Sequence, residues 1–159
     1  MKASSLAFPA AVAFAIAGMA WGMVMGISQD HSAMPAHAHL NLLGWVSLFL
    51  MGLYYRIHPA FDSNRLALTQ VWFWIAGSIV HPFGMGLVLR GHMIGGPMIG
   101  VGSLQLLVGM ALFGWQILRG EAQGANQRSA TLAPSAGSGM VISDQSLESL
   151  LETLDRERD

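Results

Sequence analysis

The chain has 159 residues, of which 53% are apolar and only 11% are charged. Because a soluble domain usually carries about a quarter charged residues, this composition excludes an ordinary soluble globular fold. The net charge of −1 provides no basic stripe, so nucleic acid is not an expected partner. Cysteine is absent, which excludes disulfides, iron–sulfur clusters and thiolate zinc sites and leaves His and Met as soft metal ligands.

Four long apolar segments precede a polar tail. A helix that crosses a bilayer needs about 20 mainly apolar residues, and such segments occur at residues 7–27, 37–57, 66–89 and 97–118. We therefore predict an all-α fold, an integral membrane four-helix bundle over residues 1–119. An alternative for the first segment is a cleaved signal peptide, because Lys2 precedes an apolar stretch that ends in small residues around Ala17 to Ala20.

The remaining residues have a different character, since seven of the nine acidic side chains lie after Gly120. Residues 120–142 are rich in Gly, Ala, Ser and Gln, which predicts a flexible linker. In residues 143–159, leucines recur at helical spacing among acidic residues, which predicts a short amphipathic helix. This helix either docks on a partner or has no binding role, because isolated helices of this length are barely stable in water.

The Lys and Arg residues predict the orientation in the membrane. The first loop has none and the third has Arg90 alone, whereas the other cations flank the opposite ends of the segments: Lys2, Arg56, Arg65, Arg119 and Arg128. Positive residues collect on the cytoplasmic side. We therefore expect both termini in the cytoplasm of a bacterium, with the chain in the inner membrane.

The four segments contain no Asp or Glu, and this narrows the function. Ion transport through carboxylates and Ser–His hydrolysis both need an acid there, so neither is expected. The glycines Gly95, Gly96, Gly100 and Gly102 lack the Lys-Ser/Thr of a nucleotide loop and are expected to let helices approach closely.

The positions of the histidines are the strongest indication of function in the sequence. In the predicted topology five of the six lie at or near the outer side, and only His58 lies on the cytoplasmic side; the five are His31, His37, His39, His81 and His92. Imidazole inside a membrane is costly and usually faces the bundle interior or a cofactor. The cluster therefore predicts a cofactor or metal site.

Periodicity distinguishes two of these histidines. On a regular helix His37 and His39 lie about 200° apart, so they cannot bind one metal ion together. His37 shares a small, polar face with Asn41 and Gly44, whereas His39 lies with Leu43. Periodicity therefore favours His37 as the inward residue.

His81 has two interpretations because Pro82 follows it inside an apolar helix. Proline removes an amide donor and leaves carbonyls unpaired in lipid, so His81 either satisfies one of them or is a ligand.

Residues 37–45, His-Ala-His-Leu-Asn-Leu-Leu-Gly-Trp, are followed by Gly52-Leu53-Tyr54-Tyr55 and His58-Pro59. This pattern resembles the second helix of subunit I in the haem–copper oxidase superfamily, above all in the nitric oxide reductases and C-type oxidases. The resemblance implies that His39 is an axial ligand of a low-spin haem. Subunit I has many more membrane helices and a metal centre with an adjacent His-His pair, which this chain lacks. The chain is therefore not expected to be a self-sufficient oxidase or nitric oxide reductase.

We predict from these observations a membrane protein that binds haem b through His39 and either His81 or His92, with an electron-transfer or respiratory accessory role. His39 is expected about two residues inside its helix and His81 about eight, so the pair needs a kink at Pro82 or an early helix end near Gly84. Five aromatic residues could pack against a porphyrin or anchor the membrane interface: Trp45, Trp72, Trp74, Phe83 and Trp115.

Two other functions remain open at this point. One is a copper-binding protein of oxidase assembly, whose candidate ligands are His31, Met34, His37, His39 and His92, with Met93 nearby. The other is a purely structural small subunit. The partners that fit these interpretations are the lipid bilayer, a respiratory-chain or oxidase-assembly protein, and further copies of the chain.

Overall fold

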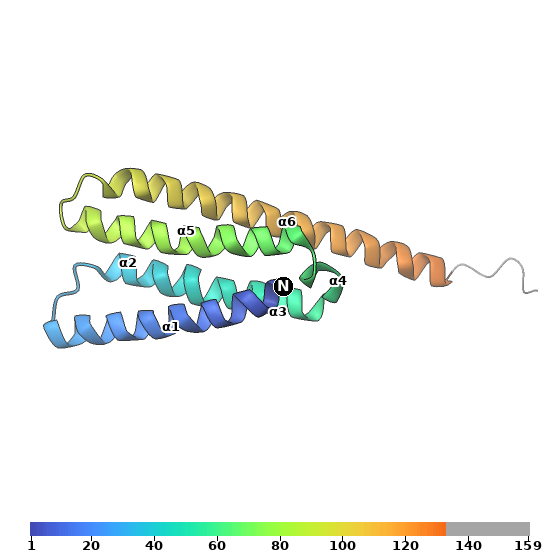
Figure 1. Cartoon of the computed structure of the whole chain (residues 1–159), viewed down its shortest axis with the longest axis horizontal. Coiled ribbons are helices and arrows are strands. Elements are labelled where there is room, and N and C mark those ends of the chain that lie inside the picture. Colours follow the sequence, from blue (N-terminus) through green and yellow to red (C-terminus); the bar gives the residue numbers. More distant parts are fainter. Residues whose placement is uncertain (133–159) are drawn as a thin grey trace, which may run out of the picture. The chain divides into compact units, whose positions relative to one another are not determined.

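The computed structural model describes residues 1–132, in which every regular element is a helix. The elements are α1 Ala3–Ser28, α2 Met34–His39, η1 Leu40–Ser47, α3 Leu48–Ile57, α4 Pro59–Asp62, α5 Arg65–Leu89 and α6 Gly95–Leu132 (Figure 1). The α2, η1 and α3 helices follow one another without a break, and η1 is π-helical. The chain divides after Gly120 into two units, of which Met1–Gly120 contains the bundle.

Four helical runs in the described residues are long and apolar enough to cross a membrane: Ala3–Ser28, Met34–Ile57, Arg65–Leu89 and Gly95–Ala122. The predicted number of apolar helices and the all-α class are confirmed. The second run begins three residues before the predicted start at residue 37, and the fourth begins two residues before residue 97. Helix α6 continues to Leu132, so residues 120–132 are helical, where the sequence predicts part of a flexible linker. The rest of the predicted linker and the predicted helix over residues 143–159 lie outside the described residues.

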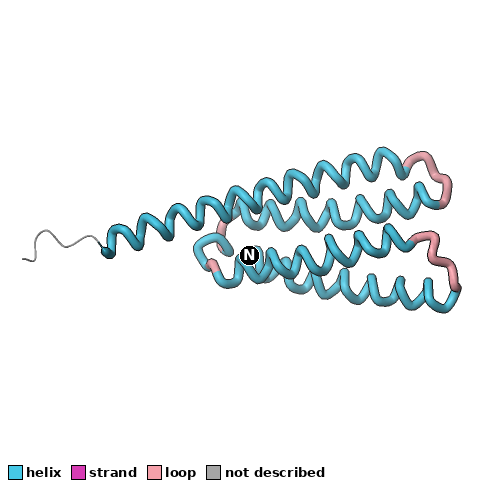
Figure 2. Tube along the Cα trace, turned by 180° about the vertical axis from the view of Figure 1, so that it is seen from behind, coloured by secondary structure: helices cyan, strands magenta, loops and turns pink. Residues whose placement is uncertain are grey.

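The loops at residues 29–33 and 90–94 lie at the same end of the bundle, which we call the loop end (Figures 1 and 2). The N-terminus and α4 lie at the opposite end, the terminal end. Helix α5 stops in a Schellman motif, in which His92 N–H donates to Leu87 O and Gly91 N–H to Val88 O. Gly91 has φ of 81°, a left-handed conformation that glycine adopts without strain.

Small residues bring α1 against the second helical run. Ala3, Ala7 and Ala11 are completely buried in α1, and a Cβ on Gly18 would meet the side chain of Asn41 at 2.3 Å. Close approach through small residues is the usual way in which membrane helices associate. In the structure, residues 3–28 thus pack as one helix of the bundle.

Glycines at every seventh position of α6 face α5. A Cβ on Gly102 would meet the backbone of His81 at 2.6 Å, and Gly95 and Gly109 are similarly close to α5. The expected role in helix packing is therefore confirmed for Gly95 and Gly102. Gly96 and Gly100 have open space beside them and do not serve this contact.

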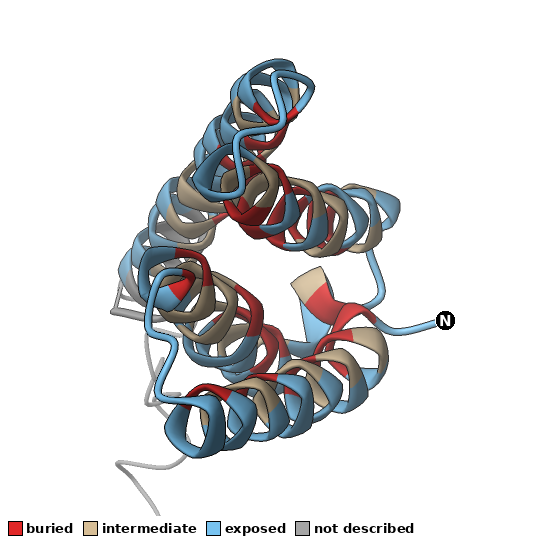
Figure 3. Cartoon of the chain, turned by 90° about the vertical axis from the view of Figure 1, so that its left-hand side faces the viewer, coloured by how far each residue is buried: buried red, intermediate tan, exposed pale blue. Residues whose placement is uncertain are grey.

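Two polar networks lie inside the bundle, where the buried residues gather on the facing sides of the helices (Figure 3). The Tyr55 hydroxyl donates to Gln70 Oε1 at 2.9 Å and accepts from Gln116 Nε2 at 3.0 Å. At the terminal end, the buried Asp62 carboxylate accepts from the backbone N–H of Ser4 at 2.7 Å and from its hydroxyl at 2.8 Å. These bonds satisfy groups that water does not reach.

Candidate functional site

Two histidines from different helices meet near the loop end. His39 is the last residue of α2 and His81 lies in α5. Their ring centroids are 5.0 Å apart, with an angle of 36° between the ring planes. Both rings are partly buried. The structure therefore brings together the two residues that the sequence predicts as a ligand pair.

Each ring is oriented through its Nδ1 atom. His39 Nδ1 lies 2.8 Å from the carbonyl oxygen of Pro35, one turn earlier in α2. Since a carbonyl only accepts, this contact places the proton on Nδ1 and leaves a lone pair on Nε2. His81 Nδ1 lies 3.1 Å from Ser103 Oγ on α6.

The Nε2 atom of His81 is buried and has no hydrogen-bond partner in the structure. A buried polar atom without a partner is costly, and in native proteins it frequently marks a site that something else completes. A histidine whose Nδ1 bonds to the protein while Nε2 stays available is the usual arrangement of a metal or haem ligand. Both members of the pair have this arrangement.

His39 and His81 lie at more similar distances from the loop end of their helices than the sequence predicts. Because α2 begins at Met34, His39 lies five residues inside the helix rather than two, or ~7.5 Å. His81 lies eight residues before Leu89, the last residue of α5, or ~12 Å. The α5 helix runs through Pro82 to Leu89, so the early end near Gly84, one of the two conditions considered for the pair, does not occur.

His37 faces a different neighbour. Its ring packs edge-on against Trp21 of α1 at a centroid distance of 6.2 Å, and its Nε2 lies 3.3 Å from Asn41 Nδ2. A Cβ on Gly22 would lie 3.1 Å from this ring. His37 therefore points toward α1 while His39 points toward α5, so both face neighbouring helices, as the angle of about 200° between them allows.

The π-helical segment η1 directly follows His39, and nothing in the sequence predicts it. A π-helix widens the hydrogen-bond ladder and often occurs at functional sites. Its carbonyls take bonds from side chains: Trp74 Nε1 donates to Leu43 O at 2.9 Å, and Ser47 Oγ donates to Leu42 O at 2.8 Å. Trp74 thus anchors η1 to α5.

The remaining histidines do not join the pair. His31 and His92 are exposed in the loops, and Met34 is 59% exposed at the start of α2. His58 lies near the terminal end, where its ring stacks on Tyr54 at 4.2 Å. Among the described residues, no group of three or more His, Cys, Asp or Glu side chains could hold a metal ion. The predicted copper ligands are therefore not gathered into such a group.

Four of the five predicted aromatic residues are exposed: Trp45, Trp72, Phe83 and Trp115. Trp74 is 2% exposed and is committed to its bond with Leu43. Trp115 also packs against the guanidinium of Arg119 at 4.6 Å.

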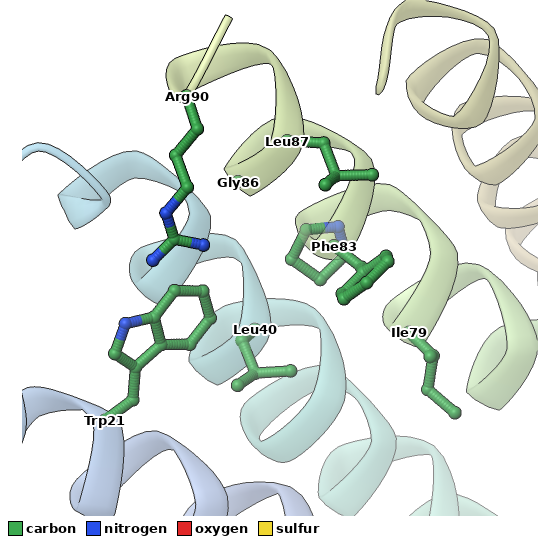
Figure 4. Close-up of a pocket in the computed structure, with 8 residues that line it drawn as sticks. Trp21, Leu40, Ile79, Phe83, Gly86, Leu87 and Arg90 are labelled. Carbon is green, nitrogen blue, oxygen red and sulfur yellow. The ribbon is translucent and has the colours of Figure 1, made fainter. Parts of the chain in front are cut away.

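A separate cavity of about 230 Å³ lies between α1, η1 and α5 near the loop end (Figure 4). Trp21, Leu40 and Phe83 contribute to its wall, and the Arg90 side chain extends toward Trp21.

The positive charge of Arg90 also acts on Asp30 in the first loop. The pKa of Asp30 is held below its usual value, mainly because the Ser32 backbone N–H donates to its carboxylate, with a smaller contribution from Arg90.

Comparisons with known proteins give no assignment for this chain. No family model matches it, and no curated protein or solved structure shows a significant match. The likeness of residues 37–59 to subunit I therefore stays a prediction, and the functional proposal starts from the histidine geometry.

Proposed function

We propose that the chain is an integral membrane protein that binds haem b between His39 and His81 and transfers electrons or serves a respiratory complex. The observation that carries this proposal is the facing pair of rings, 5.0 Å apart, each held by the protein at Nδ1. The buried Nε2 of His81, which has no hydrogen-bond partner, supports a ligand that the protein itself does not supply.

Membrane insertion is supported by the four apolar runs and by the placement of the cations. The fold gathers Lys2, Arg56, Arg65 and Arg119 at the terminal end and leaves Arg90 at the loop end. Under the positive-inside rule, the terminal end faces the cytoplasm and the histidine pair lies toward the outer side of the bacterial inner membrane.

The donor set favours haem because haem needs two protein ligands and the site supplies two. With metal–nitrogen bonds of about 2 Å, two imidazoles on opposite sides of an iron place their centroids about 6 Å apart. The observed distance of 5.0 Å is therefore about 1 Å shorter than a bound haem requires. Binding of haem would therefore require the two rings to move apart by about 1 Å.

Haem b bound by two histidines would supply one-electron transfer. In this chain, Pro35 and Ser103 orient the two rings through Nδ1, and the two Nε2 atoms would hold the iron. Because both rings are only partly buried, we propose that a membrane partner or a second copy of the chain completes the cover of the porphyrin.

Copper is the second candidate, and the ring separation favours it. Two imidazoles at a tetrahedral angle on one ion place their centroids about 5 Å apart, close to the 5.0 Å observed. Such an ion would need two further ligands, and the described residues provide no third His, Cys, Asp or Glu in a metal-binding group. The donor set therefore ranks copper below haem.

Visible spectroscopy and metal analysis of the purified wild-type protein test the assignment. The proposal predicts a Soret band and iron in a ratio of about one per chain after expression with sufficient haem. If the purified protein contains copper and shows no Soret band, the copper assignment is correct and the haem assignment is wrong. A colourless, metal-free protein that does not take up added hemin would contradict both.

A further inference from the structure

We infer that the cavity beside Arg90 binds one anionic phospholipid, with the headgroup phosphate at Arg90 and an acyl chain along α5. The inference depends on the membrane insertion proposed above but not on haem binding. It is supported by the apolar wall of the cavity, its length and the position of its single cation.

The wall is apolar over the length of one lipid leaflet. The cavity extends from Ile79 in α5 to Arg90 directly after it, a rise of eleven residue steps or ~16 Å. Half of a hydrocarbon core of about 30 Å has nearly the same length. Ile79 and Phe83 are 52% and 60% exposed, so the cavity opens at the surface of the bundle, where a lipid chain can enter.

Arg90 lies where a phosphate group would be. It directly follows the last residue of α5, so it lies at the headgroup level of the proposed outer leaflet. Its side chain extends over the apolar cavity toward Trp21 (Figure 4). Among the described residues, no carboxylate forms an ion pair with it at contact distance, and Asp30, the nearby acid, accepts from the Ser32 N–H instead. The charge therefore remains available to an anion above an apolar slot.

The cavity is distinct from the histidine pair. At 100° per residue, the α5 residues that line it lie about 100° to 240° around the helix axis from His81. His81 faces α6, as its contacts with Ser103 and the backbone near Gly102 show. A ligand in the cavity and a haem at the pair would thus occupy different sides of α5.

Two glycines provide matched variants for a test. Gly86 is buried and lines the cavity, and a Cβ there would meet no heavy atom within 4 Å. The Cβ of a new side chain at this position therefore meets open space, and Gly86→Leu is expected to occupy part of the cavity. Gly100 also has open space around its Cβ but lies on α6, away from the cavity, so Gly100→Leu is the control.

Native mass spectrometry of the detergent-purified full chain measures the binding of added phosphatidylglycerol and phosphatidylcholine. Wild type is expected to prefer phosphatidylglycerol, and Arg90→Gln should weaken its binding about fivefold and the binding of the zwitterionic phosphatidylcholine less. Arg90→Lys should retain most of the preference. Gly86→Leu should lose both lipids, whereas Gly100→Leu should behave as wild type.

Three results would overturn the inference: no lipid preference in wild type, an unchanged preference in Arg90→Gln, or equal lipid binding by the two glycine variants. The visible spectrum of the same samples separates this inference from the haem proposal. Gly86→Leu should keep any Soret band of wild type, and its loss would show that the cavity and the histidine pair form one site. Lipid binding by a protein without a Soret band would support the lipid site and would contradict only the haem proposal.

Discussion

The indole of Trp74 in α5 donates to the carbonyl oxygen of Leu43 in the π-helical segment η1, at 2.9 Å. This bond supplies a partner for a carbonyl where the helix ladder is widened, directly after the His39 position. In lipid such a carbonyl has no water to replace the lost partner. The bond therefore couples the shape of η1 to the position of α5.

Trp74→Phe removes the donor and keeps most of the ring. We expect a loss of about 1–2 kcal/mol in unfolding free energy, because the Leu43 carbonyl stays buried without its partner. Chemical denaturation in detergent micelles measures the loss. Trp72→Phe is the control, since Trp72 is 51% exposed; equal losses in the two variants would show that the Trp74–Leu43 bond has no special importance.

Ser103→Ala tests the orientation of His81. Without the hydroxyl, His81 Nδ1 loses its partner, and we expect haem binding to weaken by about tenfold or more. In wild type, a hydrogen bond from His81 Nδ1–H to the hydroxyl oxygen would make the ligand ring more electron-rich. Because Ser103→Ala removes this bond, the midpoint potential of the haem should also rise. Hemin titration and redox titration measure the two effects.

Ser103→Thr should restore both properties, since it keeps a hydroxyl. Ser47→Ala is a matched control, because Ser47 donates to the backbone carbonyl of Leu42 and does not contact a histidine. If Ser103→Ala leaves both the affinity and the potential unchanged, the contact with His81 plays no part in ligation.

The sequence predicts most of the fold but only part of the site. Apolar length alone identifies the four long helices, because lipid requires segments of about 20 residues. The same pattern places the start of the second helix too late, since Met34 and Pro35 lie in a polar stretch that composition alone does not mark as helical. For this reason the depth of His39 is underestimated.

The site depends on contacts that no local pattern contains. Periodicity selects His37 and the resemblance selects His39, and the structure gives each a different neighbour, Trp21 for His37 and His81 for His39. The contact of Ser103 with His81 joins α6 to α5 across 22 positions of sequence. The π-helical segment η1 likewise accepts a hydrogen bond from the distant Trp74, a contact that local propensity cannot reveal.

Asp62→Ala should loosen the start of α1. Its carboxylate accepts from both the backbone N–H and the hydroxyl of Ser4, near the positive end of the helix dipole. We expect a loss of about 2–3 kcal/mol in unfolding free energy, because hydrogen bonds to a buried charged group are strong. Ser4→Ala should cost less, because it keeps the backbone bond.

A double-mutant cycle of Asp62→Ala and Ser4→Ala tests whether the two residues stabilise the protein through their mutual hydrogen bond. Once Asp62 is absent, removing the Ser4 hydroxyl should have almost no further effect. Fully additive losses would show that the two residues act independently.

Reporter fusions test the proposed orientation. A periplasm-active enzyme fused after Arg119 should be inactive, and the same enzyme inserted near Ser32 should be active, because the cations gather at the terminal end. The reverse pattern would place the histidine pair toward the cytoplasmic side.

The central claim is that His39 and His81 together hold one haem, and a reduced-minus-oxidised difference spectrum tests it most directly. The spectrum compares wild type with His39→Ala, His81→Ala and His58→Ala, each purified as a monodisperse protein of wild-type helicity. His58 stacks on Tyr54 near the terminal end and serves as the control. We expect the α-band and Soret band of a six-coordinate haem b in wild type and His58→Ala, and their loss in the other two variants. An unchanged spectrum in either His39→Ala or His81→Ala would contradict the account.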